Sequence, residues 1–409
     1  MSKSMSNRLP LEGIRVLDFT WAWAGPQTTL LMALLGAEVI KVESRRRLDH
    51  TRLRSLVAGP SMQGPDHSFI FNTLNLNKLS LTLNLSKPEA VEIARALAAK
   101  SDVVAQNMRP GVLDRLGLGY DDLKKLKPDI IMLSSSAVGS TGLERLYTGY
   151  APTFAAMGGL AYISGRRGGR PAPLMGSVDL RVGTTGAFAV LAALYYRKRT
   201  GRGQYIDLSS AEAVSALMGD AFMDYTMNGR VCQRTGNDDP AIAPHGVYRC
   251  KGENQWVSIV AANDEEWRAL CGVIGDERLT ADARFADSLS RRQNNDALDE
   301  LIGAWTRERT PQEVTTALQA AGVAAMPVYA GEDLVNDPHV VDQGIIVDVE
   351  HPLMGKKRVL RPPWRFSKTP ATINRHGPLM GEHNDFLLGG LLGMSKEEIE
   401  RLTAAEVLY

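Results

Sequence analysis

Short apolar runs alternate with amphipathic stretches at the start of the chain. Residues 11–18 have the alternating apolar positions of a buried strand, and an apolar helix is predicted over 27–35. Gly36 caps this helix, and a second strand follows over 37–42. A strand, a helix and a strand in this order form a right-handed unit with parallel strands. The first stretch therefore predicts a βαβ unit.

The same alternation continues to about residue 140. We predict further strands over 80–85, 102–105 and 130–133, and helices over 88–98, 111–116 and 120–126. This order indicates an α/β fold with an open, doubly wound parallel sheet. Ligands of such sheets bind beyond the carboxyl ends of the strands. Those ends would bring residues 21–26, 43–47, 107–110 and 134–139 to one rim.

One acidic residue, Asp179, precedes a long apolar stretch. A loop rich in Pro and Gly leads to Asp179, and small residues dominate the helix predicted over 183–196. We expect this helix to be buried nearly all round, to end in basic residues and glycine, and to lead into a strand over 204–208. Asp179 would lie just before the helix, where free N–H groups favour negative charge. On this pattern alone, Asp179 is an N-cap or first-turn acid.

A smaller α+β unit is predicted after about residue 230. Residues 246–260 are typical of a β-hairpin with a longer turn. A helix over 211–227 comes before it. After it we predict helices over 265–274, 297–305 and 311–321, strands over 323–328 and 345–349, a loop over 377–384 and a helix over 395–402.

Composition narrows the class of protein. The 409 residues carry 47 basic and 46 acidic side chains, a balance that argues against a nucleic-acid partner. Three cysteines without metal-ligand spacing predict neither a disulfide framework nor a metal site, and suit a reducing cytoplasm. The first ten residues lack the apolar region of a signal peptide. The longest apolar stretch is shorter than the roughly 20 residues that span a bilayer, so no membrane association is predicted.

Most common catalytic motifs are missing. The turn over 20–26 is not G-x-G-x-x-G, which removes the main sequence support for a nicotinamide dehydrogenase. The chain also has no G-x-S-x-G, no H-E-x-x-H and no P-loop. The basic run over 45–47 could meet a polyphosphate or simply be solvated. His245 could be an acid–base group but is more often structural at such a position, and the role of His383 stays open.

Several stretches together resemble one family. They are 11–26, 35–43, 71–85, 102–117, 179–213 and 381–384, and they are similar to the family III CoA-transferases, which include formyl-CoA transferase and carnitine CoA-transferase. The resemblance implies a Rossmann-like large domain built from both chain ends, a smaller α+β domain, and two chains interlocked like links. It implies a large domain over 1–200 and 331–409, a small domain over 229–305, and linkers over 201–228 and 306–330.

The resemblance also assigns residues. The family's nucleophile is an aspartate followed four residues later by glycine, which matches Asp179 and Gly183. The positions matching or adjoining the family's CoA contacts are Trp23, Ala24, Arg45, Leu83, Asn107, Met108, Arg109, Arg115 and Ser136. Trp21 and His245 would face the acid substrates. CoA thioesters would be substrates, with no permanently bound cofactor and no metal.

Three departures separate the chain from formyl-CoA transferase. That enzyme has Gln at Trp23 and Lys at Ser136, and its Gly-rich lid is replaced here by residues 238–245. These differences argue against formyl-CoA or oxalate as the substrate. The turn over 21–26 and residues 243–248 instead resemble the heteromeric branch that includes succinyl-CoA:(R)-benzylsuccinate CoA-transferase.

Two other functions stay open. The α-methylacyl-CoA racemases of the same superfamily use a Gly-His-Asp motif, which is Gly149-Tyr150-Ala151 here, so one base would be absent. A supporting subunit that works with a homologous partner chain is the third reading.

Overall fold

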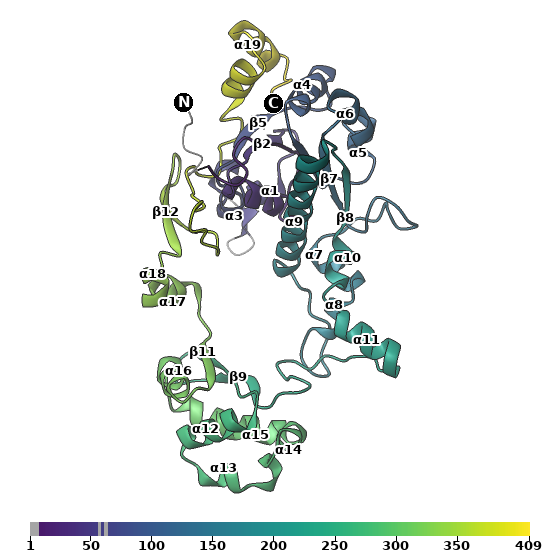
Figure 1. Ribbon diagram of the computed structural model, residues 1–409. Helices are drawn as coiled ribbons and strands as arrows, with labels where there is room; N and C mark the ends of the chain where they lie inside the picture. The colour runs from purple at the N-terminus through teal and green to yellow at the C-terminus, as the bar shows by residue number, and fades with distance from the viewer. Residues whose placement is uncertain (1–7, 56–58, 61–63) are drawn as a thin grey trace. The chain divides into compact units, whose positions relative to one another are not determined.

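The computed structural model describes residues 8–55, 59–60 and 64–409 (Figure 1). The chain forms two compact units. The larger contains Met1–Ala161, Pro173–Met223 and Gln343–Tyr409, and the smaller contains Tyr162–Ala172 and Asp224–Asp342. Residues 1–7, part of the segment for which the sequence predicts no signal peptide, lie outside the described residues.

A six-stranded sheet organises the larger unit. Its order is β5 (Leu79–Thr82), β2 (Glu38–Glu43), β1 (Arg15–Asp18), β6 (Val103–Gln106), β7 (Ile131–Ser136), β8 (Tyr205–Ser209). Every neighbouring pair is parallel, so the predicted α/β fold with a parallel sheet is confirmed. The strand order reverses at β1, which puts the switch point between the loops that follow β1 and β6.

The two faces of this sheet are covered by different helices. Leu17 of β1 belongs to a core with α4 (Pro88–Ala99), α6 (Tyr120–Leu126) and α19 (Lys396–Ala404). Val16, its neighbour, points to the opposite core with α1 (Ala24–Leu34) and α9 (Ser177–Thr200). The two-residue period of a strand thus serves two cores at once.

Shorter elements complete the larger unit. They are α2 (His50–Leu53), β3 (Arg54–Ser55), β4 (Gly59–Pro60), η2 (Pro65–His67), α3 (Phe69–Leu74), α5 (Val112–Arg115), α7 (Ala151–Met157), α8 (Leu160–Ile163), α10 (Ser210–Ser215), the hairpin of β12 (Ile346–His351) and β13 (Gly355–Leu360), and η4 (Phe386–Leu391). The single helix predicted over 211–227 is wrong, because α10 ends at Ser215 and a separate helix, α11 (Gly219–Asn228), begins at Gly219. The boundary between the two units falls within α11.

Helix α9 differs from its prediction in two ways. It begins at Ser177 rather than near Gly183, directly after Gly176 with its positive φ of 57°. It is also not buried all round, because Phe188 is 73% exposed while Val190 on the other face is fully buried. Helix α9 packs on α1 (Figure 1), and Gly183, Gly186, Ala187 and Ala193 are buried, whereas Ala192 is exposed.

Among the described residues, α9 is the one helix long and apolar enough to cross a membrane by length and composition. Its packed face belongs to the core of the larger unit, which accounts for its composition without a membrane.

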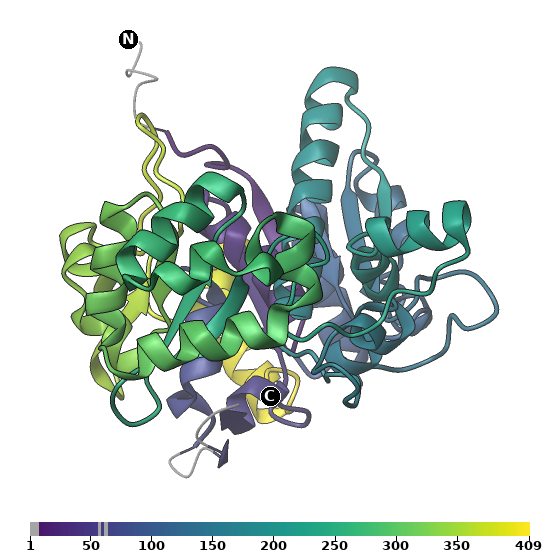
Figure 2. The ribbon, with the colours of Figure 1, turned by 90° about the horizontal axis from the view of Figure 1, so that it is seen from below.

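The smaller unit has its own sheet and core. Strands β9 (His245–Arg249), β10 (Trp256–Val260) and β11 (Ala324–Pro327) are antiparallel in the order β11-β10-β9, and the predicted hairpin is confirmed. Helices gather around these strands (Figure 2): α12 (Asp264–Ile274), α13 (Glu277–Ala281), η3 (Ala283–Phe285), α14 (Ser288–Gln293), α15 (Asn295–Arg307) and α16 (Pro311–Ala320). The chain after β11 forms α17 (Gly331–Asn336) and α18 (Pro338–Asp342) of the same unit.

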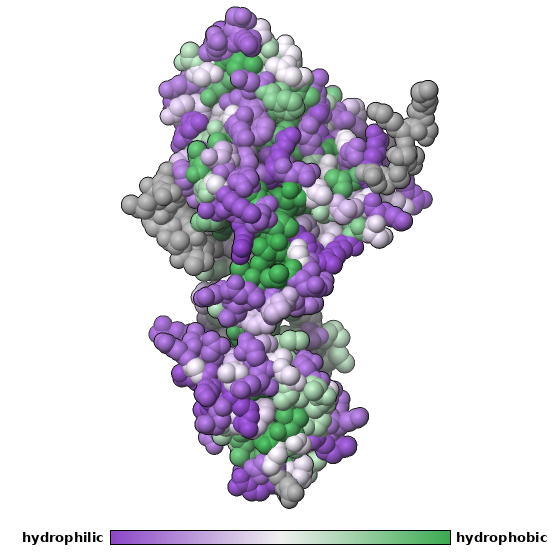
Figure 3. Space-filling model, turned by 90° about the vertical axis from the view of Figure 1, so that its left-hand side faces the viewer, coloured by the Kyte–Doolittle hydropathy of each residue, from purple (hydrophilic) through white to green (hydrophobic). Residues whose placement is uncertain are grey.

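Apolar side chains also reach the surface of the chain, as one face shows in Figure 3. Phe69, Leu353 and Leu360 of the larger unit are each more than half exposed.

Candidate active site

The side chain of Asn107 holds the loop after β1 in place. The backbone N–H of Trp21 donates to Oδ1 of Asn107 over 2.9 Å, and the Asn107 amide donates to the Trp21 carbonyl over 2.8 Å. Asn107 follows β6, so the two loops at the switch point are joined directly. A Cβ at Gly25 would lie 2.5 Å from Cβ of Thr20 and 3.0 Å from Cγ of Asn107. Only glycine therefore fits this turn, and two of the predicted site residues meet here.

Two glycines let α9 approach α1 closely. A Cβ at Gly183 would lie 2.7 Å from the Gln27 side chain and 2.8 Å from the carbonyl oxygen of Ala24. Thr28 of α1 donates its hydroxyl to the Gly183 carbonyl over 2.9 Å, and a Cβ at Gly186 would lie 2.6 Å from Thr28 Oγ1. The glycine four residues after the acid thus has a physical reason, because it brings the two helix starts together.

Asp179 uses this closeness to cap α1. Trp23 occupies the N-cap position of α1, but its indole can donate and cannot accept a hydrogen bond. The backbone N–H of Ala24 instead donates to the Asp179 carboxylate, which lies in the first turn of α9. Two helix starts therefore meet at one carboxylate. The prediction that Asp179 precedes its helix is wrong by one turn, but its position at a helix start is as expected.

The environment of Asp179 makes its carboxyl group less acidic. Burial raises its pKa to about 6, and the hydrogen bond from Ala24 opposes this shift. The residue is half-buried rather than sealed from solvent. Val178, the residue before Asp179, belongs to one packed apolar cluster with Ala24 and Ala151. A partly desolvated carboxylate of this kind suits nucleophilic attack.

An aromatic stack lies beside this loop. The Trp21 ring stacks on His50 with 5.0 Å between centroids, and the Arg47 guanidinium lies 4.3 Å from the centroid of the Trp21 ring. His50 in turn contacts Tyr150, 5.9 Å between centroids, and Tyr150 precedes Ala151 of the cluster beside Asp179. The stack is a cationic and aromatic surface that an anionic substrate could use.

The other residues predicted to contact CoA, of which Arg115 lies in α5 and the rest at or just after the carboxyl ends of strands, have different environments. Leu83 is 1% exposed in the core, and Met108 packs against that same core. Arg109 and Arg115 are exposed around α5. Arg45 donates to the carbonyl of Met380 over 3.3 Å, while Oγ of Ser136 and Nε1 of Trp23 are buried without a hydrogen-bond partner in the described part of the chain.

His245 belongs to the other unit. It starts β9, and its Nδ1 lies 2.6 Å from the backbone oxygen of Asn237.

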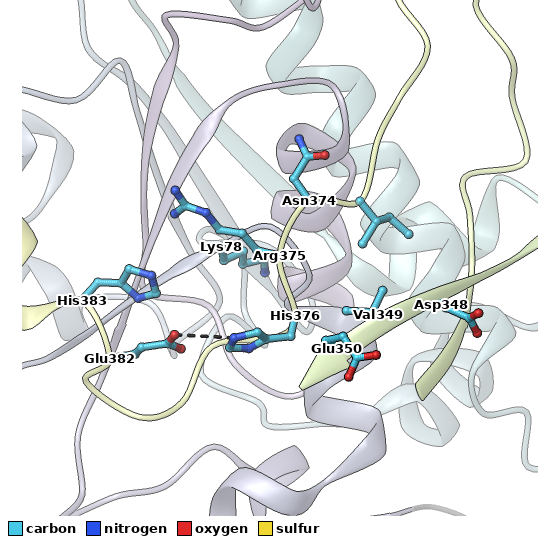
Figure 4. A pocket seen from close by; sticks show the side chains of 10 residues that line it. Lys78, Asp348, Val349, Glu350, Asn374, Arg375, His376, Glu382 and His383 are labelled. Atoms are coloured by element: carbon cyan, nitrogen blue, oxygen red, sulfur yellow. Dashed lines mark ion pairs between the residues drawn. The ribbon is translucent and has the colours of Figure 1, made fainter. Parts of the chain in front are cut away.

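His383 lines a cavity of about 410 Å³ in the larger unit (Figure 4). Its Nδ1 accepts a hydrogen bond from the Ser80 N–H over 3.2 Å, and burial lowers its pKa. His376 and Glu382 form an ion pair of 3.6 Å in the same cavity, as the dashed line marks in Figure 4. None of the residues predicted to bind CoA lines this cavity. His383 thus joins the C-terminal segment to β5.

The sequence contained weak signals for residues that we had not singled out. Arg47 belongs to a run of three arginines, and the residues of the run alone do not show which one contacts an aromatic ring. Its guanidinium lies over Trp21, which distinguishes it from Arg45 and Arg46. His50 had no signal. Lys41, a charged residue within an apolar strand, was visible in the sequence as an anomaly. Within the described residues, no group of three or more His, Cys, Asp or Glu side chains could hold a metal ion.

Known proteins show the same architecture and sequence pattern. A model described as CoA-transferase family III matches residues 11–384. A succinyl-CoA–D-citramalate CoA-transferase of Chloroflexus aurantiacus is 33% identical, over 98% of both chains. The succinyl-CoA:glutarate CoA-transferase of Mus musculus is 31% identical, over 98% of this chain and 90% of its own.

Two further comparisons bear on assembly and fold. The beta subunit of a succinyl-CoA–L-malate CoA-transferase of Chloroflexus aurantiacus is 33% identical over 98% of both chains. A crystal structure of a CaiB/BaiF family protein from Brucella suis has a TM-score of 0.83 and 29% identity, and the match covers 94% of this chain and 100% of that one.

Proposed function

The chain belongs to CoA-transferase family III and is a CoA-transferase acting between acyl-CoA and acids, and we propose that Asp179 is its nucleophile. The observation that carries this proposal is the half-buried Asp179 carboxylate at two meeting helix starts, with its pKa raised to about 6 by burial. The names of the relatives support succinyl-CoA as the donor.

The proposed reaction passes through two kinds of activated aspartate. The Asp179 carboxylate attacks the donor thioester, giving a mixed anhydride and CoA thiolate. The thiolate attacks the aspartyl carbonyl of the anhydride, which frees the donor acid and leaves an aspartyl-CoA thioester. The acceptor carboxylate then displaces CoA, and the thiolate attacks the acceptor's carbonyl in the second anhydride. The products are the acceptor's CoA thioester and free Asp179, with no net use of ATP.

The acceptor is proposed to be a dicarboxylic acid. The acceptors in the names of three relatives, citramalate, glutarate and malate, all carry two carboxylates. Trp21 and the Arg47 guanidinium over its ring could receive the distal carboxylate and an apolar substituent. The resemblance at residues 21–26 makes (R)-benzylsuccinate, an acid of anaerobic toluene degradation, our specific candidate.

CoA itself is proposed to lie along the carboxyl edge of the parallel sheet. Trp23, Ala24, Asn107, Met108 and Arg109 follow β1 and β6 at the switch point. The further positions proposed to contact CoA are Arg45, Leu83, Arg115 and Ser136, and His245 is proposed to face the acids from the smaller unit. No permanently bound cofactor is part of this proposal.

A second chain is proposed to complete the enzyme, either as an interlocked homodimer or as a heteromer with a homologous subunit. Helix α11 has no buried residue in the single chain, although several of its side chains are apolar. Phe222, Tyr225 and Met227 are each at least 60% exposed. Phe188 of α9 is exposed as well. Apolar helix surfaces of this kind are expected to be covered. The relatives named alpha and beta subunits support a paralogous partner, and we propose a cytoplasmic location for the assembly.

The racemase alternative keeps one point in its favour, since the same sheet and the same aspartate would serve it. Tyr150 stands where those enzymes have histidine, and its ring contacts His50. The relatives compared above bear the names of transferases.

One experiment distinguishes the three functions. The purified chain, alone and with any co-purifying homologue, is incubated with succinyl-CoA and treated with hydroxylamine, and the modified residue is located by mass spectrometry. Modification at Asp179 is expected for the transferase. Exchange of the substrate's α-proton without acyl transfer would identify a racemase. Neither signal, together with tight binding to a second chain, would identify a supporting subunit.

A further inference from the structure

A fully buried lysine of β2 reaches the loop that carries the capping N–H group. Nζ of Lys41 donates to the carbonyl of Thr20 over 2.7 Å and to Oδ2 of Asp49 over 3.3 Å. The side chains of Lys41 and Asp49 are 1% and 2% exposed. Oδ1 of Asp49 accepts the backbone N–H of Ala22 over 3.0 Å. The pair therefore binds the backbone of the loop at Thr20 and at Ala22.

A second buried pair holds both sides of the same loop. Nζ of Lys78 donates to Oδ2 of Asp18 over 3.2 Å and to the carbonyl of Pro26, within α1, over 3.1 Å. Oδ1 of Asp18 accepts the N–H of Thr20 over 2.9 Å. Burial opposes the ionisation of Asp18, but Lys78 and the neighbouring hydroxyls outweigh it and lower its pKa. All four charged side chains are buried, and each makes a hydrogen bond to the backbone of residues 20–26.

The backbone of the loop needs such support. Ala22 has a φ of 64°, a left-handed conformation that residues other than glycine rarely adopt. Strain of this kind persists where surrounding contacts determine the conformation. Ala22 is hydrogen-bonded to Asp49 and lies two residues before Ala24, whose N–H donates to the Asp179 carboxylate. The strained residue therefore connects the buried pair to the nucleophile.

Stability alone is a weak reason to bury these charges. Desolvation offsets most of the attraction in a buried ion pair, and apolar residues of similar volume often serve stability as well. The Lys41–Asp49 pair makes its other hydrogen bonds to backbone groups of the loop and to Thr51. Such a pair is well suited to fix a conformation.

We propose that Lys41 and Asp49 are positioning residues for the reaction, which hold the Ala22 turn so that the Ala24 N–H stays directed at the Asp179 carboxylate. Lys78 and Asp18 support the same loop from its other side. This inference rests on the proposed role of Asp179 as the nucleophile. Neither residue of the pair contacts the carboxylate; they act through the backbone between residues 20 and 24.

The test is a double variant, Lys41→Met with Asp49→Asn. It removes both charges together, so no unpaired charge is buried, and asparagine retains an acceptor for Ala22. Single-turnover acylation of Asp179 by succinyl-CoA is measured across pH, together with the Kd for CoA and the Tm. We expect acylation to slow by about 10²-fold, as for misplacement of a reacting group by about 1 Å. Because Trp23 and Ala24 of the same loop are proposed to contact CoA, acylation is measured at saturating succinyl-CoA, so that a change in the Kd for CoA does not enter the rate.

The pH profile supplies a readout that a merely structural role would not move. The Ala24 hydrogen bond lowers the pKa of Asp179, so its loss should move the midpoint of acylation upward from the parent value. The matched control is Arg197→Met with Asp102→Asn, a 2.9 Å pair near the opposite end of the strands that also involves α9. It should lower the Tm without moving the midpoint.

Each outcome decides between the two proposals. If the double variant acylates within twofold of the parent and with the same midpoint, the positioning role is refuted while the nucleophile stands. If the parent itself gives no adduct at Asp179, the proposed function fails instead. Should the double variant not fold, Ala22→Val is measured in its place, because a β-branched residue is strongly disfavoured at a φ of 64° and disturbs the turn without touching the buried charges. An unchanged midpoint in that variant would also refute the positioning role.

Discussion

Replacing Gly183 by alanine is expected to impair the enzyme although it should favour the helix. In a helix interior, alanine is more favourable than glycine by about 0.5–1 kcal/mol. At Gly183, however, the new Cβ would lie 2.8 Å from the Ala24 carbonyl oxygen, a backbone atom that cannot rotate away. Overpacking of this kind costs about 1–3 kcal/mol. Helices α1 and α9 should therefore separate by several tenths of an ångström.

The consequence for activity follows from the same geometry. Asp179 is one helical turn before Gly183, on the same face, and receives its hydrogen bond from the Ala24 N–H. Separation of the helices should weaken that bond and displace the carboxylate. We expect kcat to fall by about 10-fold to 10²-fold, with a smaller change in the KM for succinyl-CoA. Steady-state transfer assays and urea unfolding measure the two effects.

Two matched glycines separate the causes. Gly272 lies within α12 with nothing within 4 Å of a Cβ, so Gly272→Ala should stabilise the smaller unit by about 0.5–1 kcal/mol and leave kcat unchanged. Gly186→Ala meets side-chain atoms of Thr28 and Leu208, which can adjust, so it should lower stability more than activity. A Gly183→Ala enzyme with parental kcat and increased stability would refute the reasoning.

Four further outcomes are expected. Asp179→Asn should abolish detectable transfer in a coupled assay that the parent passes. Because the folded pKa of Asp179, about 6, lies above its unfolded value of about 3.8, the carboxylate lowers stability as pH rises from about 4 to 6, and urea unfolding at pH 7 should find Asp179→Asn more stable than the parent. The transfer rate should fall with acidification below about pH 6 as the nucleophile is protonated, and a profile flat to pH 5 would contradict this. Arg47→Met should raise the KM for dicarboxylate acceptors by about tenfold or more and leave the KM for monocarboxylates unchanged. Arg46 pairs with Glu406 at the surface, so Arg46→Met should change neither KM.

The order of elements in the parallel sheet could be predicted because each strand carries its own signal. Residues such as Val16, Leu17 and Ile40 are apolar on both faces of a strand that is covered on both sides. Gly36 and the first-turn Pro88 mark helix boundaries that the structure retains within a few residues. These signals are local, so one sequence suffices to find them.

Contacts between distant segments could not be predicted in the same way. Nothing near Ser177 shows that Asp179 caps another helix, because the N–H that it accepts belongs to a residue 155 positions earlier. The stack of Arg47, Trp21 and His50 likewise depends on how the loops after β1 and β2 fold together. The exposed side of α9 was missed because apolar residues such as Phe188 do not reveal whether the chain's own core or another surface covers them.

The hydrogen bond from the Ala24 N–H explains how Asp179, the proposed nucleophile, can be both basic and ionised. A higher pKa makes a carboxylate a better nucleophile toward a thioester, but a carboxylate with a pKa far above neutrality would be protonated. With a pKa of about 6, Asp179 is about nine-tenths ionised at pH 7. Burial alone would raise the pKa further, and the Ala24 N–H counters it. The pKa of this one carboxylate therefore depends on three features of the larger unit. Burial raises it, the buried charges hold the loop that carries the opposing Ala24 N–H, and Gly183 lets α1 approach closely enough for that hydrogen bond to form.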